Sequence, residues 1–467
     1  MVQQKVRGRE VPPADLPPER NGDIPRLVGD IRHLVPKLGL REYWYPAVPA
    51  SRVGKRKPVQ VRMLGEDLCF FRGKKGQVVA IGDICPHRGA RLSEGDCHYK
   101  GTVACPYHGW VWDERGRNVA VLSEGPQSGV CGKPGTEARV YPTKTLKGIV
   151  FVWMGSEAPA PIEEDVPEEF FDRDAYIFFN DQIMWQTNWE VGLENSMDSH
   201  VGYLHRDALT GLLSAPNSGA RPAQGSKIAF TGNGFRNAGG LTFAPQPQDI
   251  YPNGWRWPKH TFRNKWIWAF RWFFEWTCVP APPPKSVRWS SGHRLPGMFR
   301  AGGFVAPPKA DGNGTNGANP AAGANGGTPA AGNVGPMSVR RRINGLFGFY
   351  TRQTVPVDEW LTRVWYYHYT RPESKLQLLW FRLLYWCIYR WLSEYNFSQQ
   401  DMSVMLNQVY DWPEKLSGTD AEVIQWRKLV VTKHFGGRNA PFEFRSTDGL
   451  AEDEAPDAHM FADTLTE

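Results

Sequence analysis

The sequence has 467 residues, a length that admits about three domains, and its 22% charged and 41% hydrophobic residues are typical of a folded globular chain. The formal net charge of +7 is small, and the only basic run that stands out is the short one at 340–342. This charge pattern excludes a nucleic-acid-binding tail as the dominant feature, so no nucleic-acid partner is expected. Seven cysteines, odd and sparse, do not indicate a disulfide framework. The 20 Trp, 24 Phe and 16 Tyr indicate either a large apolar pocket or an unusually aromatic core.

The chain begins with a polar, proline-rich segment, which we interpret as an N-terminal arm over 1–36. It has no apolar signal segment, so a cytoplasmic location is expected. Two later stretches, 266–283 and 376–392, are apolar, but each carries two charged residues and neither reaches the 20 or so apolar residues of a spanning helix. We therefore expect 376–392 to be a buried helix, with an oligomer contact or a contact with a membrane surface as the alternatives.

Alternating apolar runs separated by glycine turns predict a β-rich domain over 37–160, and the proline-rich segment 157–167 is expected to be a linker. A second domain follows over 161–450. Within it we expect a helix at 188–205, then strands, then helical segments at about 373–410 and 418–435. The Gly-, Ala- and Asn-rich stretch 308–337 is predicted to be a flexible surface insertion, and the acidic residues 451–467 a disordered tail.

Two short motifs in the first domain combine cysteine with histidine. They are Cys85-Pro-His87 and Cys105-Pro-Tyr-His108, followed by Gly89 and Gly109. Zinc could accept two thiolates and two imidazoles, but a Cys-x-His pair is too tight for one small ion. A [2Fe-2S] cluster of the Rieske type, with thiolates on one iron and imidazoles on the other, suits the spacing better. The other five cysteines have no such spacing and are expected to be small buried residues: Cys69, Cys97, Cys131, Cys278 and Cys387.

A second possible metal site follows about 80 residues later. Two histidines and one carboxylate form the facial triad of non-haem Fe(II) sites, and His200 and His205 supply the histidines. They are five residues apart, about 140° on a regular helix, so we expect the helix to break near Gly202 or to carry a π-bulge. The carboxylate is either Asp198 beside them or the distant Asp401; otherwise all four are ordinary solvated helix residues.

With both motifs in view, the sequence resembles the terminal oxygenases of Rieske non-haem iron ring-hydroxylating systems, in particular the homotrimeric carbazole and 2-oxoquinoline type. The similarity begins near Lys37-Leu38-Gly39 and ends near Trp426-Arg427-Lys428. It implies an α+β chain, with a β-rich Rieske domain and a helix-grip-like catalytic domain in which helices cover an antiparallel sheet.

The resemblance also implies roles for individual residues. Cys85, His87, Cys105 and His108 would bind the cluster, and His200, His205 and Asp401 would bind a mononuclear Fe(II). Asp198 would bridge to a cluster histidine of a neighbouring subunit in a homotrimer. Asn195 would be a polar positioning group near the iron, or else only a helix-stabilising hydrogen bond. One departure is that a single residue separates Asp198 from His200, where the family has two.

The implied reaction uses O2 to hydroxylate a hydrophobic, aromatic or polycyclic substrate. Electrons would come from NAD(P)H through a separate ferredoxin or reductase, because the chain has no dinucleotide-binding glycine motif. Aromatic segments at 255–257 and 266–274 indicate either the substrate pocket or core packing. The alternatives are a pure electron-transfer protein, an O- or N-demethylase, or a membrane-associated oxygenase of sterol, terpenoid or tetrapyrrole metabolism.

Overall fold

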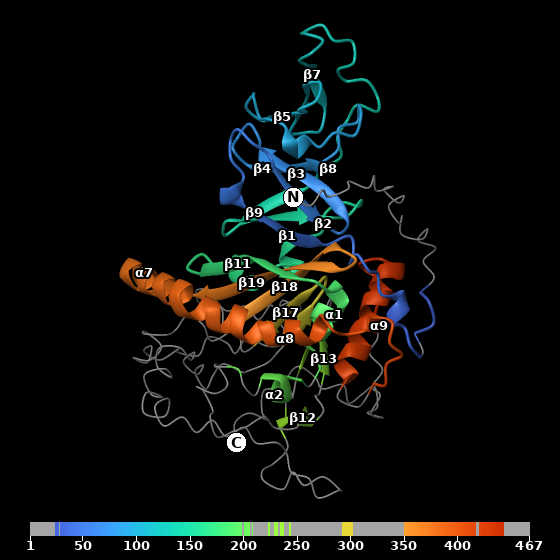
Figure 1. Ribbon diagram of the computed structural model, residues 1–467, viewed down its shortest axis with the longest axis vertical. Coiled ribbons are helices and arrows are strands. Elements are labelled where there is room, and N and C mark those ends of the chain that lie inside the picture. The colour runs from blue at the N-terminus through green and yellow to red at the C-terminus, as the bar shows by residue number, and fades with distance from the viewer. Residues whose placement is uncertain are drawn as a thin grey trace, which may run out of the picture.

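The computed structural model describes residues 24–27, 29–198, 200–205, 208, short stretches between 223 and 243, 292–301, 350–416 and 420–442. In this part a β-rich N-terminal unit stands above a larger sheet that carries helices on one face (Figure 1). This arrangement confirms the predicted α+β class. Four expectations lie outside the described residues: the insertion 308–337, the tail 451–467, Cys278 and the aromatic segments 255–257 and 266–274.

Three small antiparallel sheets form the N-terminal unit. Their strands are short because glycine turns interrupt the apolar runs, as expected. The sheets comprise β2 (Val59–Met63), β3 (Glu66–Arg72), β4 (Val78–Gly82) and β8 (Val140–Tyr141); β5 (Thr102–Ala104), β6 (Trp110–Asp113) and β7 (Asn118–Val121); and β1 (Trp44–Pro49), β10 (Ile149–Trp153) and β9 (Thr143–Leu146). Every residue of β10 is buried, which explains its continuous apolar run.

The lower unit is built on a seven-stranded antiparallel sheet. Its order is β11 (Tyr176–Trp185), β19 (Leu361–Thr370), β18 (Tyr350–Asp358), β17 (Met298–Ala301), β16 (Gly292–Arg294), β14 (Gly234–Asn237) and β13 (Ile228–Thr231). A separate pair joins β12 (Ala223–Gln224) to β15 (Thr242–Phe243). Because side chains alternate along a strand, one face of β19 sends Trp365 and Tyr367 into the core shared with the N-terminal unit, and the other sends Val364 and Tyr366 toward the helices.

Helices α7 (Lys375–Leu384) and α8 (Ser398–Met405) cover that second face, whereas α9 (Ala421–Gly436) packs into the core shared with the N-terminal unit. Two shorter helices are α1 (Trp189–Glu194) and α2 (Val201–Leu204). Two π-helical segments, Tyr385–Tyr389 and Trp391–Phe397, lie between α7 and α8, so that one long helical rod crosses the sheet (Figure 1). The expected helices near 373–410 and 418–435 are therefore confirmed.

The helix expected over 188–205 does break, as predicted, but earlier than Gly202. Residues 195–198 form a turn and a bend, and α2 is a separate short helix. The Asn188 side chain caps α1 by accepting a hydrogen bond from the backbone of Glu190. The π-helical geometry lies instead near Asp401, upstream of α8.

The prediction of a buried helix at 376–392 was only half right. Phe381, Leu384, Tyr385 and Tyr389 pack beneath it, but a second apolar side faces outward. The cause is that apolar residues surround this helix while the sheet covers one side only. Cys387 is exposed on it, which corrects its expected burial. Among the described residues, no helix is both long and apolar enough to cross a membrane.

The segment expected to be a linker, 157–167, is packed into the structure. Asp165 is fully buried there, accepts a hydrogen bond from the Trp44 backbone at 2.8 Å, and pairs with Arg438 beyond α9 at 2.8 Å. Ile162 and Val166 belong to the core that extends through both units. The two units are therefore tied together at this segment.

Candidate metal centres

The two Cys/His loops of the N-terminal unit share one backbone pattern. The Cys85 amide donates to the carbonyl of Ala90 at 2.8 Å, and the Cys105 amide to that of Trp110 at 2.7 Å. In each loop a glycine four residues on donates back to the cysteine carbonyl. Gly89 and Gly109 adopt φ values of 74° and 64°, in the left-handed region that glycine enters without strain. The sequence thus builds two equivalent loops.

The cysteines and the histidines of these loops differ in burial. Cys85 and Cys105 are 2% and 3% exposed and their thiols are in contact. The imidazoles of His87 and His108 lie toward the surface, with ring centroids 4.6 Å apart, and His87 stacks on Trp110. Burial raises the pKa of the Cys85 thiol to about 11, so a thiolate needs a cation there. Two thiols inside and two imidazoles outside suit an iron pair whose two irons have different ligands.

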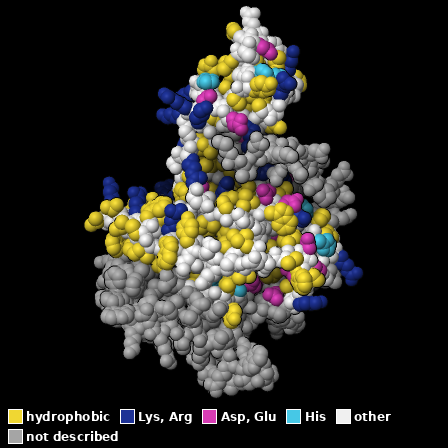
Figure 2. Space-filling view, viewed as in Figure 1, with side chains coloured by type: hydrophobic (Ala, Val, Ile, Leu, Met, Phe, Trp, Pro, Cys, Tyr) yellow, Lys and Arg dark blue, Asp and Glu magenta, His cyan; other side chains and the backbone are white. Residues whose placement is uncertain are grey.

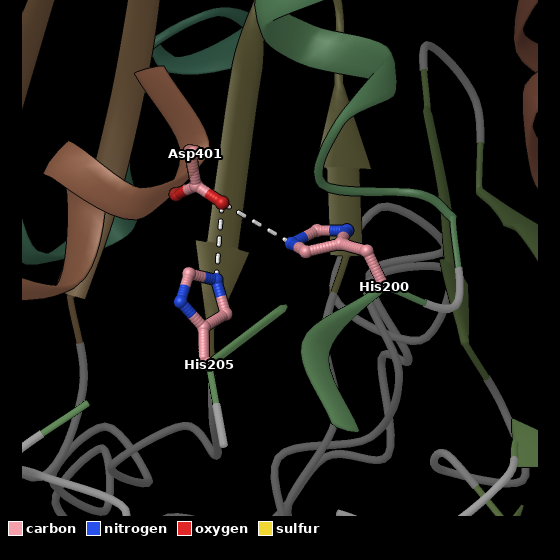
Figure 3. Close-up of side chains that lie close together, drawn as sticks. All are labelled: His200, His205 and Asp401. Atoms are coloured by element: carbon pink, nitrogen blue, oxygen red, sulfur yellow. Dashed lines mark ion pairs between the residues drawn. The ribbon is translucent and has the colours of Figure 1, made fainter. Parts of the chain in front are cut away.

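The second site joins α2 to α8. The Nε2 atoms of His200 and His205 lie 3.2 and 3.0 Å from Oδ1 of Asp401 (Figure 3). Within the described parts of the chain, these three residues form the one group of at least three His, Cys, Asp or Glu side chains whose ligand atoms converge closely enough to hold a metal ion. His205 and Asp401 are buried, whereas His200 is partly accessible.

Both imidazoles are held through their other nitrogen. Gln400 lies 2.9 Å from His205 Nδ1, and the Asp198 carboxylate contacts His200 Nδ1. Phe397 stacks on the His205 ring with centroids 3.6 Å apart. Each histidine therefore presents Nε2 toward Asp401. Metal-ligating imidazoles are commonly oriented in this way, by an acceptor that binds the other ring nitrogen.

A metal ion fits this arrangement. Nε2 of His205 and Oδ1 of Asp401 are buried and neither makes a hydrogen bond, although they lie 3.0 Å apart. Burial opposes ionisation of Asp401, but His200 and His205 outweigh it and hold the pKa of this carboxyl well below its usual range. Burial likewise disfavours protonation of His200, but Asp198 and Asp401 raise its pKa to about 9. A cation at the convergence point would satisfy the orphaned atoms and replace that proton.

A buried arginine adds positive charge to the same face of the sheet. Arg352 on β18 is 2% exposed, and its guanidinium lies over the rings of Trp185 and Phe299 at 4.9 and 5.1 Å. It also helps to lower the pKa of Asp401. Together with burial, it lowers the pKa of His293 to about 3, so this imidazole is neutral.

The remaining predicted residue, Asn195, makes no hydrogen bond through its side-chain oxygen. Asn195 ends α1, and its Oδ1 is buried without a hydrogen-bond partner, so this oxygen does not stabilise the helix. The sequence reasoning missed Gln400, Phe397 and Arg352. The first two had a signal, because with Asp401 they occupy positions i, i+3 and i+4 of one helical face. Arg352 had none, since only the sheet register places it near the site.

Two protein-family models match the chain: a Rieske [2Fe-2S] domain at residues 43–130 and a homotrimeric ring hydroxylase at residues 153–213. The cluster motifs fall in the first and both histidines of the triad in the second, while Asp401 lies outside both.

Two curated relatives are terminal oxygenase components of the same enzyme, carbazole 1,9a-dioxygenase. The component from a Sphingomonas species is 38% identical over 176 residues, which cover 37% of this chain and 45% of the relative. The component from Metapseudomonas resinovorans is 32% identical over 188 residues, which cover 40% of this chain and 48% of the relative. The chain thus spans about half the length of the curated relatives it matches. The solved terminal oxygenase of carbazole 1,9a-dioxygenase from Nocardioides aromaticivorans IC177 has the same fold, with a TM-score of 0.64 and 24% identity over 87% of this chain and 98% of that one. The chain is therefore similar over part of its length to carbazole 1,9a-dioxygenase terminal oxygenases, and it contains segments that match a Rieske [2Fe-2S] domain and a homotrimeric ring hydroxylase.

Proposed function

We propose that this chain is the terminal oxygenase of a Rieske non-haem iron system that uses O2 and externally supplied electrons to hydroxylate a hydrophobic, aromatic or polycyclic substrate. One observation carries the proposal: the chain with the Rieske domain also brings His200, His205 and Asp401 together with orphaned ligand atoms. A pure electron-transfer protein has no use for this second convergence.

In this proposal Cys85, His87, Cys105 and His108 hold the [2Fe-2S] cluster, and His200, His205 and Asp401 hold a mononuclear Fe(II). When bound, the two iron centres supply the electron storage and the O2 chemistry. The chain keeps Asp401 ionised and turns both Nε2 atoms inward. The hydrogen bond that His205 Nδ1 donates to Gln400 Oε1 and the stacked Phe397 ring limit the rotation of His205.

Asp198 is proposed as the bridge between subunits. Its Oδ1 accepts a hydrogen bond from the His200 backbone at 3.0 Å and contacts the His200 ring, yet the side chain is 36% exposed. It can therefore hold His200 on one side and meet a neighbouring subunit on the other. Asn195, whose Oδ1 has no partner, is proposed as a polar positioning group near the iron.

The position of the cluster loops indicates where electrons would enter the protein. His87 and His108 lie toward the surface, so a separate ferredoxin or reductase fed by NAD(P)H can approach the cluster at these imidazoles. Structural relatives include an oxygenase–ferredoxin complex of carbazole 1,9a-dioxygenase. A homotrimer, in which one subunit's cluster serves the next subunit's iron, and a cytoplasmic location are parts of the same proposal.

Aromatic side chains support a hydrophobic substrate. Trp185, Phe299, Tyr350 and Tyr366 belong to the ring cluster on the sheet face that carries the helices. Trp185, Phe299 and Tyr366 are buried, so they would form the packed wall of an aromatic-lined site, and such sites bind planar hydrophobic ligands. A 4beta-methylsterol monooxygenase from Methylococcus capsulatus is also 32% identical over 40% of this chain, but this similarity does not favour a sterol over an aromatic substrate.

Iron content and product analysis test the proposal. The anaerobically loaded protein should hold three irons per chain, and Asp401→Ala should hold two while its Rieske spectrum is unchanged. With a ferredoxin and reductase supplied, wild-type protein should convert members of a panel of carbazole-like aromatics or methylsterols into hydroxylated products, and Asp401→Ala should not. Two irons in the wild type with unchanged turnover would contradict the proposal.

A further inference from the structure

The helical rod ahead of Asp401 presents an apolar face outward. This face, named here the Leu/Trp face, consists of large side chains that are 40–76% exposed: Leu376, Leu379, Trp380, Leu383, Trp386, Trp391 and Tyr395. Figure 2 shows hydrophobic side chains gathered along this rod, with Lys and Arg side chains beside them. A contiguous exposed apolar stripe of this kind marks an interaction surface.

Charge on the rod has a single sign at the surface. Between residues 375 and 397 the accessible charged side chains are Lys375, Arg382 and Arg390. The one acid of this stretch, Glu394, is 2% exposed and accepts hydrogen bonds from Asn180 and other buried donors. The stretch 375–397 is thus apolar and basic, without an exposed acid of its own; the exposed Glu373 precedes it.

The basic groups lie against aromatic rings at the edge of the stripe. The Arg390 guanidinium is 4.8 Å from the Trp386 ring and 5.5 Å from the Tyr395 ring. Arg382 lies 5.2 Å over Tyr176 and donates to its hydroxyl at 3.2 Å. Tryptophan and tyrosine with flanking arginine suit the boundary between lipid headgroups and acyl chains, where rings enter the apolar zone and cations meet phosphates.

We propose that the Leu/Trp face is a docking surface for an anionic lipid bilayer, against which the rod lies without crossing it. Charge complementarity selects this occupant. In a symmetric pair joined through this same face, Arg382 and Arg390 would meet basic equivalents, which is repulsive. A head-to-tail contact with a different surface of another copy is the alternative occupant that the test below separates. The proposal goes beyond the oxygenase function and does not depend on it; it adds a route by which a lipid-soluble substrate reaches the enzyme.

Vesicle co-sedimentation of the full-length, iron-loaded protein tests this inference. Phosphatidylcholine vesicles are used alone and mixed with phosphatidylglycerol, without detergent. Wild-type protein should bind the mixed vesicles, and less so at high salt. The triple variant Leu379→Gln/Leu383→Gln/Trp386→Gln should bind them about tenfold less, because three apolar side chains no longer leave water. Lys375→Gln/Arg382→Gln should lose about fivefold per charge on the mixed vesicles alone.

A matched control keeps the test specific. Val409→Gln/Trp412→Gln removes apolar side chains of similar exposure, 65% and 66%, from outside the rod, and vesicle binding should not change. Circular dichroism and the cluster spectrum confirm folding of each variant. The proposal fails if wild-type protein does not bind mixed vesicles, or if the triple variant binds like wild type. A triple variant that changes oligomeric state, beside a wild type that ignores vesicles, would assign the face to another copy of the chain. Iron content and turnover are measured separately, so failure here leaves the oxygenase proposal intact.

Discussion

Glu394 anchors the rod that carries Asp401, and its replacement by alanine should destabilise the protein strongly. The buried carboxylate accepts hydrogen bonds from Asn180 at 2.6 Å, from His368 at 2.9 Å and from Tyr385 at 2.9 Å. All three donors are buried, on β11, β19 and the first π-helical segment. Each buried donor left unsatisfied costs about 1–3 kcal/mol, so the loss of the acceptor for all three in Glu394→Ala should lower the free energy of unfolding by about 3–9 kcal/mol.

The position of Glu394 also connects stability to the metal site. It lies in the second π-helical segment, which continues directly into α8, where Ser398 is 2.6 Å from the Tyr366 hydroxyl on the sheet. Loss of the anchor loosens the turn that presents Asp401. Glu394→Ala should therefore also retain less of the proposed mononuclear iron, while the cluster spectrum stays unchanged.

Urea denaturation followed by circular dichroism measures the stability, and iron analysis the occupancy. In Glu394→Gln the side chain keeps one oxygen acceptor, but its NH2 group replaces the other oxygen and faces one of the buried donors. The expected loss of unfolding free energy is therefore smaller, about 1–3 kcal/mol. Gln399→Ala, at an exposed position of α8, is the matched control and should change little. A loss below about 1 kcal/mol for Glu394→Ala would refute the reasoning, because the network would then contribute no more than a surface contact.

Three further predictions concern the metal sites and pH. Because the metal-free His200 imidazole has a pKa of about 9, Fe(II) must displace a proton, and metal affinity measured by anaerobic titration should rise with pH up to about 9; a flat profile would contradict this. Burial raises the pKa of Glu190 to about 8, so its contribution to stability is present below about pH 4.5 and is lost as the pH rises through 8. Glu190→Gln should flatten that decline in urea midpoints, and an unchanged slope would argue against it. Gly109→Ala should lose the cluster absorbance more readily than Gly89→Ala, since a Cβ at Gly109 would lie 2.8 Å from the Leu122 Cβ, whereas at Gly89 it would meet nothing within 4 Å; equal losses would show that backbone strain alone matters.

Local sequence was sufficient wherever a feature is contiguous. The β-rich first unit follows from alternating runs and glycine turns, and the loops of Cys85 and Cys105 are each complete within six residues. The spacing of Phe397, Gln400 and Asp401, which contact the histidines of the metal site, also indicates that they share one face of a helix. These features depend on backbone periodicity and on spacing, which the sequence carries directly.

Tertiary structure decided which carboxylate faces the two histidines. The sequence left Asp198 and Asp401 as alternatives; the fold turns Asp198 to His200 Nδ1 and brings Asp401, about 200 residues away, to both Nε2 atoms. It also decided that the rod at 376–392 is covered on one side only. A sequence states that a helix is apolar all round, but whether each side is buried depends on which other elements pack against it, and that is set by long-range contacts that no local pattern encodes.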